Sequence, residues 1–173
     1  MYWYVIFVQT GREYRVEEIL RGQLDSEVFT PFVPLQEMIF RKGGTIKKEL
    51  KPLFPGYVFV ESKLISQEFI KWTNTIIYTS HVIVSLLRYS DEEIAMRESE
   101  RQMLLSLCND EHCIEVSRGI IEGDKIYITD GPLKGHESII KKLNRHRRKA
   151  WIEIEFMGDV RLVSMALEIV EKI

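Results

Sequence analysis

Apolar residues recur with two different spacings at the start of the chain, and the two spacings predict different elements. Residues 2–8 form a continuous aromatic and β-branched run, which is typical of a strand covered on both faces. Thr10 and Glu13 then have the spacing of a capping box at a helix start. Apolar residues follow at helical spacing, at Val16, Ile19, Leu20 and Leu24. The pattern predicts a strand followed by a helix that packs against a sheet.

Prolines and glycines divide the next segment into short elements. Residues 28–40 have an extended pattern with prolines at 31 and 34, and Gly43-Gly44 indicates an exposed turn in a basic stretch. Ser90 and Glu93 form a second capping box, which predicts a helix through about Leu107. The remaining elements predicted here are strands at 57–60 and 82–86 and a short helix at 66–72.

The pattern changes after residue 107. Residues 108–118 have no sustained period and are predicted to be a linker, with a short strand at 114–116 as an option. Short β-like runs follow, at 125–129, 138–142, 150–156, 160–163 and 167–170. Five short strands in roughly fifty residues predict a small barrel. The predicted fold class is α+β, with an N-terminal α/β sandwich on an antiparallel sheet over 1–107 and a small barrel domain over 119–173.

Composition limits the class of protein. Hydrophobic residues make up 45% of the chain and charged residues 29%, as in an ordinary globular protein. No apolar run reaches the roughly 18 residues of a membrane helix, and the apolar start lacks the features of a signal peptide. We therefore expect a cytoplasmic protein, and a monomer is our separate expectation for its oligomeric state. Cys108 and Cys113 have only His112 beside them, too few ligands for zinc, so no metal or cofactor is predicted.

One segment concentrates positive charge in a chain whose formal net charge is -2. The stretch KKLNRHRRK, residues 141–149, holds six of the 24 lysines and arginines and no acid. Such a block is either a solvated turn or a surface for an anion. Residues spaced about 3.3 Å apart on a two-strand arm can follow a phosphate backbone, and this favours a nucleic-acid site.

Catalytic motifs are missing from the sequence. There is no Walker A, GxGxxG, GxSxG or HExxH pattern. The four histidines are scattered without a convincing nucleophile or carboxylate pair beside them. We predict that the protein is not an enzyme.

Two groups of motifs together resemble the NusG family of transcription elongation factors. The first group is WYVIFVQTGRE, VPLQE and KPLFPGYVFV, in that order, and the second is EGDKIYITDGPLKGHESIIKKL, which resembles a KOW motif. The resemblance implies an NGN domain, a flexible linker and a small SH3-like KOW barrel. It also implies that the NGN sheet receives the clamp helices of RNA polymerase, at positions matching Phe7, Leu53, Phe54, Tyr57 and Phe59.

The residues themselves leave an alternative for this aromatic surface. Alternation puts Tyr57 and Phe59 on one face of a strand, where they could be interface anchors or ordinary core. The resemblance favours anchors. It also places Arg12 and Arg15 where related factors approach the non-template DNA strand, although single arginines on a helix are usually solvated.

Two positions depart from the common KOW pattern. Ser138 stands where a glycine is common, and Leu133 stands where housekeeping members tend to have an aromatic that contacts Rho or ribosomal protein S10. The departures indicate a divergent paralogue, so a contact with Rho or S10 does not carry over safely.

The basic block resembles the LoaP subgroup of specialised NusG paralogues. That resemblance implies processive antitermination in bacteria, with the KOW domain recognising a nascent leader RNA hairpin. The expected RNA contacts are Lys141, Lys142, Arg145, His146, Arg147, Arg148 and Lys149. RfaH-type paralogues are the main competitors within the family, but their recruitment rests on DNA.

Three hypotheses follow from the sequence. The first is a specialised antiterminator that bridges polymerase and a specific RNA. The second is a general NusG-type elongation, pausing or termination factor whose KOW domain contacts proteins. The third is an RNA-binding protein of ribosomal type, since KOW motifs also occur there, and it leaves the N-terminal part unexplained.

Overall fold

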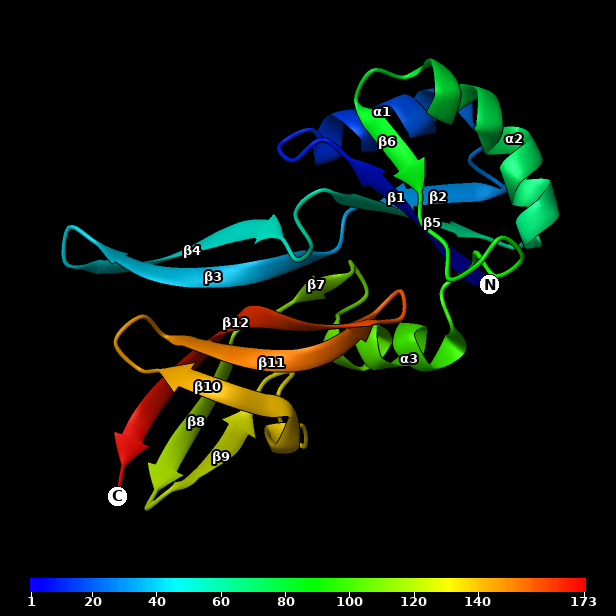
Figure 1. Cartoon of the computed structure of the whole chain (residues 1–173). Helices are drawn as coiled ribbons and strands as arrows, with labels where there is room; N and C mark the ends of the chain where they lie inside the picture. Colours follow the sequence, from blue (N-terminus) through cyan, green and yellow to red (C-terminus); the bar gives the residue numbers. More distant parts are fainter. The chain divides into compact units, whose positions relative to one another are not determined.

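The structure is a computed structural model that describes all residues, 1–173. The chain forms two compact units that are interleaved along the sequence (Figure 1). The first unit comprises residues 1–34 and 54–101, and the second comprises residues 35–53 and 102–173.

The first unit is built on a four-stranded antiparallel sheet with the order β2-β5-β1-β6. Its strands are β1 (Tyr2–Val8), β2 (Phe29–Phe32), β5 (Tyr57–Ser62) and β6 (Ile83–Leu86). The helices α1 (Glu13–Gln23) and α2 (Ser66–Thr79) lie against one face of this sheet (Figure 1). The ring of Tyr4 stacks on Phe69 of α2 with centroids 3.7 Å apart, which fixes this face as the helix side.

The opposite face of the sheet is aromatic. Register pairs Phe7 with Tyr57 and Val5 with Phe59, so these side chains share a face. The ring of Trp3, on the same face, packs edge-on against the ring of Phe59, with the ring centroids 5.8 Å apart. Alternation therefore places Tyr57 and Phe59 on the same face, as predicted, with Val58 and Val60 on the helix side.

The start of α1 differs from the predicted capping box. The helix begins at Glu13, its N-cap is Arg12, and no side chain caps it. The carboxylate of Glu13 instead accepts hydrogen bonds from the backbone N–H of Gly11, at 2.8 Å, and of Gly56, at 3.0 Å. The buried Glu13 thus ties the helix start to the turn before β5, and Thr10 has no capping role.

Two other helices have different bounds from those predicted. Helix α2 continues to Thr79, because Phe69, Thr73 and Ile76 extend its buried stripe. Ser90 Oγ does accept the N–H of Glu93, at 3.2 Å, but α3 spans only Glu98–Leu107. The backbone N–H of Met96 donates to the carbonyl of Trp3 at 2.7 Å, and this contact to β1 holds the intervening segment out of a helix.

The second unit contains a five-stranded sheet with the order β10-β11-β12-β8-β9. Neighbouring strands are antiparallel, except that β12 and β8 run parallel. The strands are β8 (Ser117–Glu122), β9 (Lys125–Asp130), β10 (Ile140–Asn144), β11 (Lys149–Phe156) and β12 (Asp159–Lys172). A 3₁₀ helix, η1 (Glu137–Ile139), precedes β10.

A three-stranded sheet, β4-β3-β7, completes the second unit. The strands β3 (Leu35–Lys42) and β4 (Thr45–Pro52) form a hairpin, and β7 (Cys113–Ile114) pairs with β3 in parallel. Gly43 and Gly44 form the hairpin turn with φ of 60° and 78°, a conformation that glycine adopts without strain. The turn predicted at these glycines is confirmed.

Two predictions on the C-terminal strands were wrong. Residues 160–163 and 167–170 belong to one strand, β12, because the residues between them continue the ladder with β11. Ser138 lies in η1 and not in a strand. Strand β8 begins at Ser117, two residues before the start of the predicted barrel domain. A mixed α/β fold is confirmed, whereas the NGN and KOW domains and their bounds stay predictions.

The apolar side chains of β11 and β12 supply much of the buried core of the second unit. Ile152, Ile154, Phe156, Met165 and Leu167 are all at most 3% exposed. In the whole chain, no helix combines the length and apolarity that crossing a membrane requires.

Candidate nucleic-acid interface

The basic block folds as the end of the β10–β11 hairpin. Residues 145–148 form the turn, and the side-chain oxygen of Asn144 accepts the backbone N–H of Arg147 at 3.0 Å. Arg148 has a φ of 54°, and its carbonyl accepts the N–H of Leu167 at 3.0 Å. The turn is therefore fixed both by its own hydrogen bonds and by a bond to β12.

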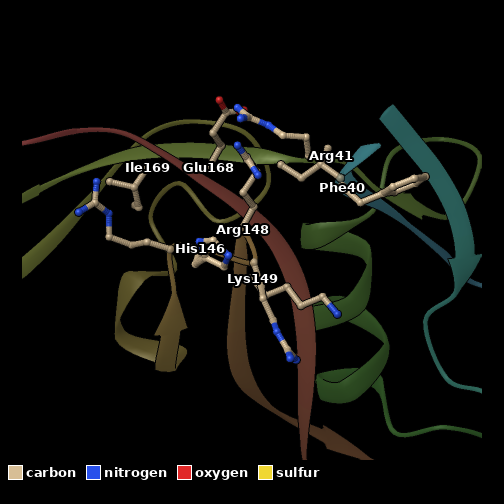
Figure 2. Close-up of a pocket in the computed structure, with 10 residues that line it drawn as sticks. Phe40, Arg41, His146, Arg148, Lys149, Glu168 and Ile169 are labelled. Atoms are coloured by element: carbon tan, nitrogen blue, oxygen red, sulfur yellow. The ribbon is translucent and has the colours of Figure 1, made fainter. Parts of the chain in front are cut away.

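A pocket of about 920 Å³ lies beside this turn. Its lining combines the turn with β3 and β12, at Ile39, Phe40, Arg41, Arg145, His146, Arg147, Arg148, Lys149, Glu168 and Ile169. Figure 2 shows side chains of β3 and of the turn together around the pocket, with Arg41 and Arg148 near Glu168. Five cations and one carboxylate give the pocket lining a net positive charge.

The structure divides the seven predicted RNA contacts into two groups. Lys141 is 3.8 Å from a carboxylate oxygen of Glu153, and the ammonium of Lys142 lies 4.9 Å from the ring centroid of Trp151. The other five residues, 145–149, line the pocket, and the four cations among them form no ion pair with a carboxylate. The four cations at the turn thus have neither a carboxylate nor an aromatic partner, whereas each of the two lysines on β10 has one of these.

The predicted polymerase contacts are mostly buried in this structure. Phe7 and Tyr57 are half-buried and stacked, with centroids 5.3 Å apart. Phe59 is fully buried, and Phe54 stacks on it with centroids 6.0 Å apart. Leu53 is buried and belongs to the second unit. The Phe7–Tyr57 stack is therefore the accessible part of this surface.

The two arginines predicted to approach DNA are exposed at the start of α1. Arg12 is the N-cap residue, and Arg15 lies 3.5 Å from a carboxylate oxygen of Glu18, three residues further along the helix. Exposed pairs of this kind contribute little to stability, so the structure leaves Arg15 accessible to another anion.

Leu133 is part of the core and not of the surface. Its side chain is 1% exposed, and its backbone N–H donates to the buried Ser117 Oγ at 2.9 Å. The side chain of Leu133 is therefore not available at the surface as an anchor for a partner.

The two cysteines are poor metal ligands in this setting. Burial, with a smaller contribution from nearby Cys113, raises the pKa of Cys108 to about 12. Burial also raises the pKa of Cys113. Both side chains are therefore protonated thiols near neutral pH. Over residues 1–173, no group of three or more His, Cys, Asp or Glu side chains could hold a metal ion.

Sequence reasoning missed the contribution of the β3–β4 hairpin to the basic pocket. Arg41 and Phe40 lie about a hundred residues before the turn, and only the fold brings them to the same pocket. The exposed basic character of the stretch around Gly43-Gly44 was the available signal, but it does not indicate where the hairpin lies. Glu168 gave no signal of its own.

The fold and the pocket define a class: an α+β protein with a cationic surface that suits a polyanion. The chain belongs to the NusG family, because the family model described as "Transcription termination factor nusG" matches residues 1–105. Members of this family are transcription termination and antitermination factors and not enzymes.

Relatives match along almost the whole chain. The transcription termination/antitermination protein NusG of Staphylococcus epidermidis is 24% identical over 176 residues, which cover 99% of this chain and 95% of the relative. The protein of the same name from Halalkalibacterium halodurans is 23% identical, covering 99% and 98%. The one from Staphylococcus aureus is 24% identical, covering 99% and 95%. This chain thus matches each of these relatives over nearly its whole length.

Proposed function

We propose that this chain is a specialised NusG-family factor that promotes processive antitermination and is recruited to its operons by nascent leader RNA. Its N-terminal part binds the clamp helices of RNA polymerase, and its basic turn contacts an RNA hairpin. The observation that carries the proposal is the pocket at residues 145–149, in which four cations have no carboxylate partner.

The unpaired charge supports a polyanionic ligand. Cations that face one pocket repel each other, and bound phosphates would remove that repulsion. Arginine forms bidentate bonds to phosphate and stacks on exposed bases, and three of the four cations are arginines. An RNA hairpin offers both phosphates and unstacked bases, so it matches this group of side chains better than a uniform DNA duplex.

The polymerase contact rests on the aromatic face of β1 and β5. The stacked rings of Phe7 and Tyr57 are half-buried and lie on the face of the sheet away from α1 and α2. Aromatic side chains are frequent interface anchors. Arg12 and Arg15, at the start of α1 just after β1, are available for the non-template DNA strand.

Two weak contacts in one chain suffice for selective recruitment. When RNA and polymerase are bound by the same molecule, the second contact forms at a high effective concentration. The factor then loads where the leader RNA emerges, and the contact with the polymerase favours elongation over pausing.

The test is a selection of stem-loops from a random RNA pool by the full chain. We expect enrichment of one stem-loop type by the wild-type chain. Replacing Arg145, Arg147, Arg148 and Lys149 by glutamine should weaken binding to that RNA by about tenfold or more. The matched control replaces Lys141 and Lys142 by glutamine. It also removes cations of the basic block, but these two lie on β10 outside the pocket lining, so it should have a much smaller effect.

Two results would count against the proposal. Unchanged RNA affinity in the four-residue variant would show that the turn does not bind RNA. Diffuse, sequence-independent binding that falls steeply with salt would favour the general NusG-type factor, whose C-terminal part contacts proteins such as Rho or ribosomal protein S10.

A further inference from the structure

The basic pocket has two walls that come from distant parts of the sequence. One wall is the β10–β11 turn, and the other is β3, which contributes Ile39, Phe40 and Arg41. Both walls belong to the second compact unit. The pocket is therefore a feature of one unit and not a gap between the two units.

The base of the β3 wall is anchored. Leu35 and Gln36 pair in parallel with Cys113 and Ile114 of β7, and the N–H of Val116 donates to the Glu37 carboxylate at 3.0 Å. From this base the β3–β4 hairpin continues in register as far as Lys42 and Thr45. Arg41 is thus carried on a paired strand, close to the free end of the hairpin.

Arg41 has no carboxylate partner. Its side chain is exposed, and no ion pair involves it. The only acid in the pocket lining, Glu168, has an oxygen 4.0 Å from Nε of Arg118, outside the lining. The guanidinium of Arg41 thus adds to the positive charge of the turn, and Glu168 offsets only one of the five positive charges in the pocket lining.

We infer that the β3–β4 hairpin is a second arm of the RNA site, and that Arg41 binds a backbone phosphate of the RNA held by the turn. The inference rests on the proposed function and assigns a residue outside the basic block to it. Two cationic arms around one pocket would bind the RNA backbone from both sides. The RNA would then follow a defined path through the pocket, which a single charged turn could not impose.

The carboxylate in the pocket favours RNA over an acidic protein segment. A carboxylate accepts hydrogen bonds, and RNA presents donors beside its phosphates, namely the 2′-hydroxyl and base amino groups. The side chains of an acidic segment present acceptors only, so Glu168 would repel them. The mixture of five cations with one acceptor therefore suits a nucleotide better than a row of carboxylates.

The experiment compares Arg41→Gln with Lys42→Gln in the full chain. Lys42 is the matched control because it is also an exposed cation and is adjacent on β3, but it does not line the pocket. The probe is a labelled RNA stem-loop with a uridine-rich loop, and its affinity is measured by fluorescence anisotropy across a salt series. Arg41→Gln should weaken binding severalfold and reduce the salt slope by about 0.7 to 1. Lys42→Gln should change both much less.

The outcomes separate this inference from the proposed function. Equal effects of the two substitutions would overturn the role of Arg41, and the turn could still bind RNA alone. If neither Arg41→Gln nor the four-residue turn variant changed the affinity, both proposals would fail. Equal affinity for the DNA stem-loop of the same sequence would overturn the assignment of the pocket to RNA.

Discussion

Gly131 illustrates how one small residue positions two segments of the second unit. Its φ is 100°, and a Cβ added to it would lie 2.5 Å from the Cα of Ser117 and 2.8 Å from the carbonyl oxygen of Val116. The turn after β9 therefore lies directly on the start of β8. Ser117 in turn accepts the N–H of Leu133, so this close approach also places Leu133 in the core.

Replacing Gly131 by alanine should destabilise the protein by about 2 kcal/mol or more, because backbone strain and a backbone clash add. Gly123→Ala is the control, since its φ of 61° is also left-handed but a Cβ there meets nothing within 4 Å. Its cost should be about 1 kcal/mol. Urea unfolding of both variants measures the difference, and equal costs would show that the contact with Ser117 is not tight.

For single residues, the sequence showed the positive charge of residues 141–149. It did not show which of these side chains contact a carboxylate or an aromatic ring. Lys142 meets Trp151 because the β10–β11 register pairs them, and Lys141 reaches Glu153 from the same ladder. A register depends on remote residues, so a local pattern could not separate these two lysines from the turn.

Among the elements, the β10–β11 turn combines a binding role with backbone strain. Arg148 adopts a φ of 54°, which is unfavourable for a side chain with a Cβ. Glycine would relieve this strain but would remove a pocket cation.

Arg148→Gly should therefore stabilise the protein by about 0.5 to 1 kcal/mol while weakening RNA binding. The control is Arg145→Gly, which removes a cation from the same turn at a residue whose φ is not positive. That variant should lose both stability and affinity. Thermal unfolding and anisotropy on the same samples give the two quantities, and a loss of stability in Arg148→Gly would contradict the strain argument.

Elements with a strong local pattern were predicted well, and those defined by distant partners were not. The strands β1 and β5 and the Gly43-Gly44 turn follow from apolar runs and turn residues. The single strand β12 depends on its ladder with β11, and the late start of α3 depends on the bond from Met96 to Trp3. Both are tertiary effects that override local propensity.

In the molecule as a whole, the two proposed binding surfaces lie in different compact units. The Phe7–Tyr57 stack belongs to the first unit and the basic pocket to the second. The sequence indicated two domains in succession, but it gave no sign that residues 35–53 join the C-terminal unit. Because the two surfaces share no residue, a change in one should leave the other intact.

Tyr57→Ala should weaken binding to RNA polymerase and leave RNA affinity unchanged. The substitution removes half of the stack with Phe7, so it should also cost about 1 kcal/mol of stability. Tyr127→Ala, at an exposed tyrosine of the second unit, serves as control and should keep polymerase binding. Co-precipitation with purified polymerase and anisotropy with RNA provide the measurements. A parallel loss of both activities in Tyr57→Ala would indicate general unfolding or a shared surface.

The interleaving of the two units also has a consequence for how the protein is made. The β3–β4 hairpin leaves the ribosome early, but its partner β7 follows only after the rest of the first unit, several seconds later at about 5–20 residues per second. Strand β12 is synthesised after β8 and β11, yet it lies between them in the sheet. The nascent second unit therefore exposes unpaired strand edges until β12 is synthesised. We expect chaperones to bind it during this interval.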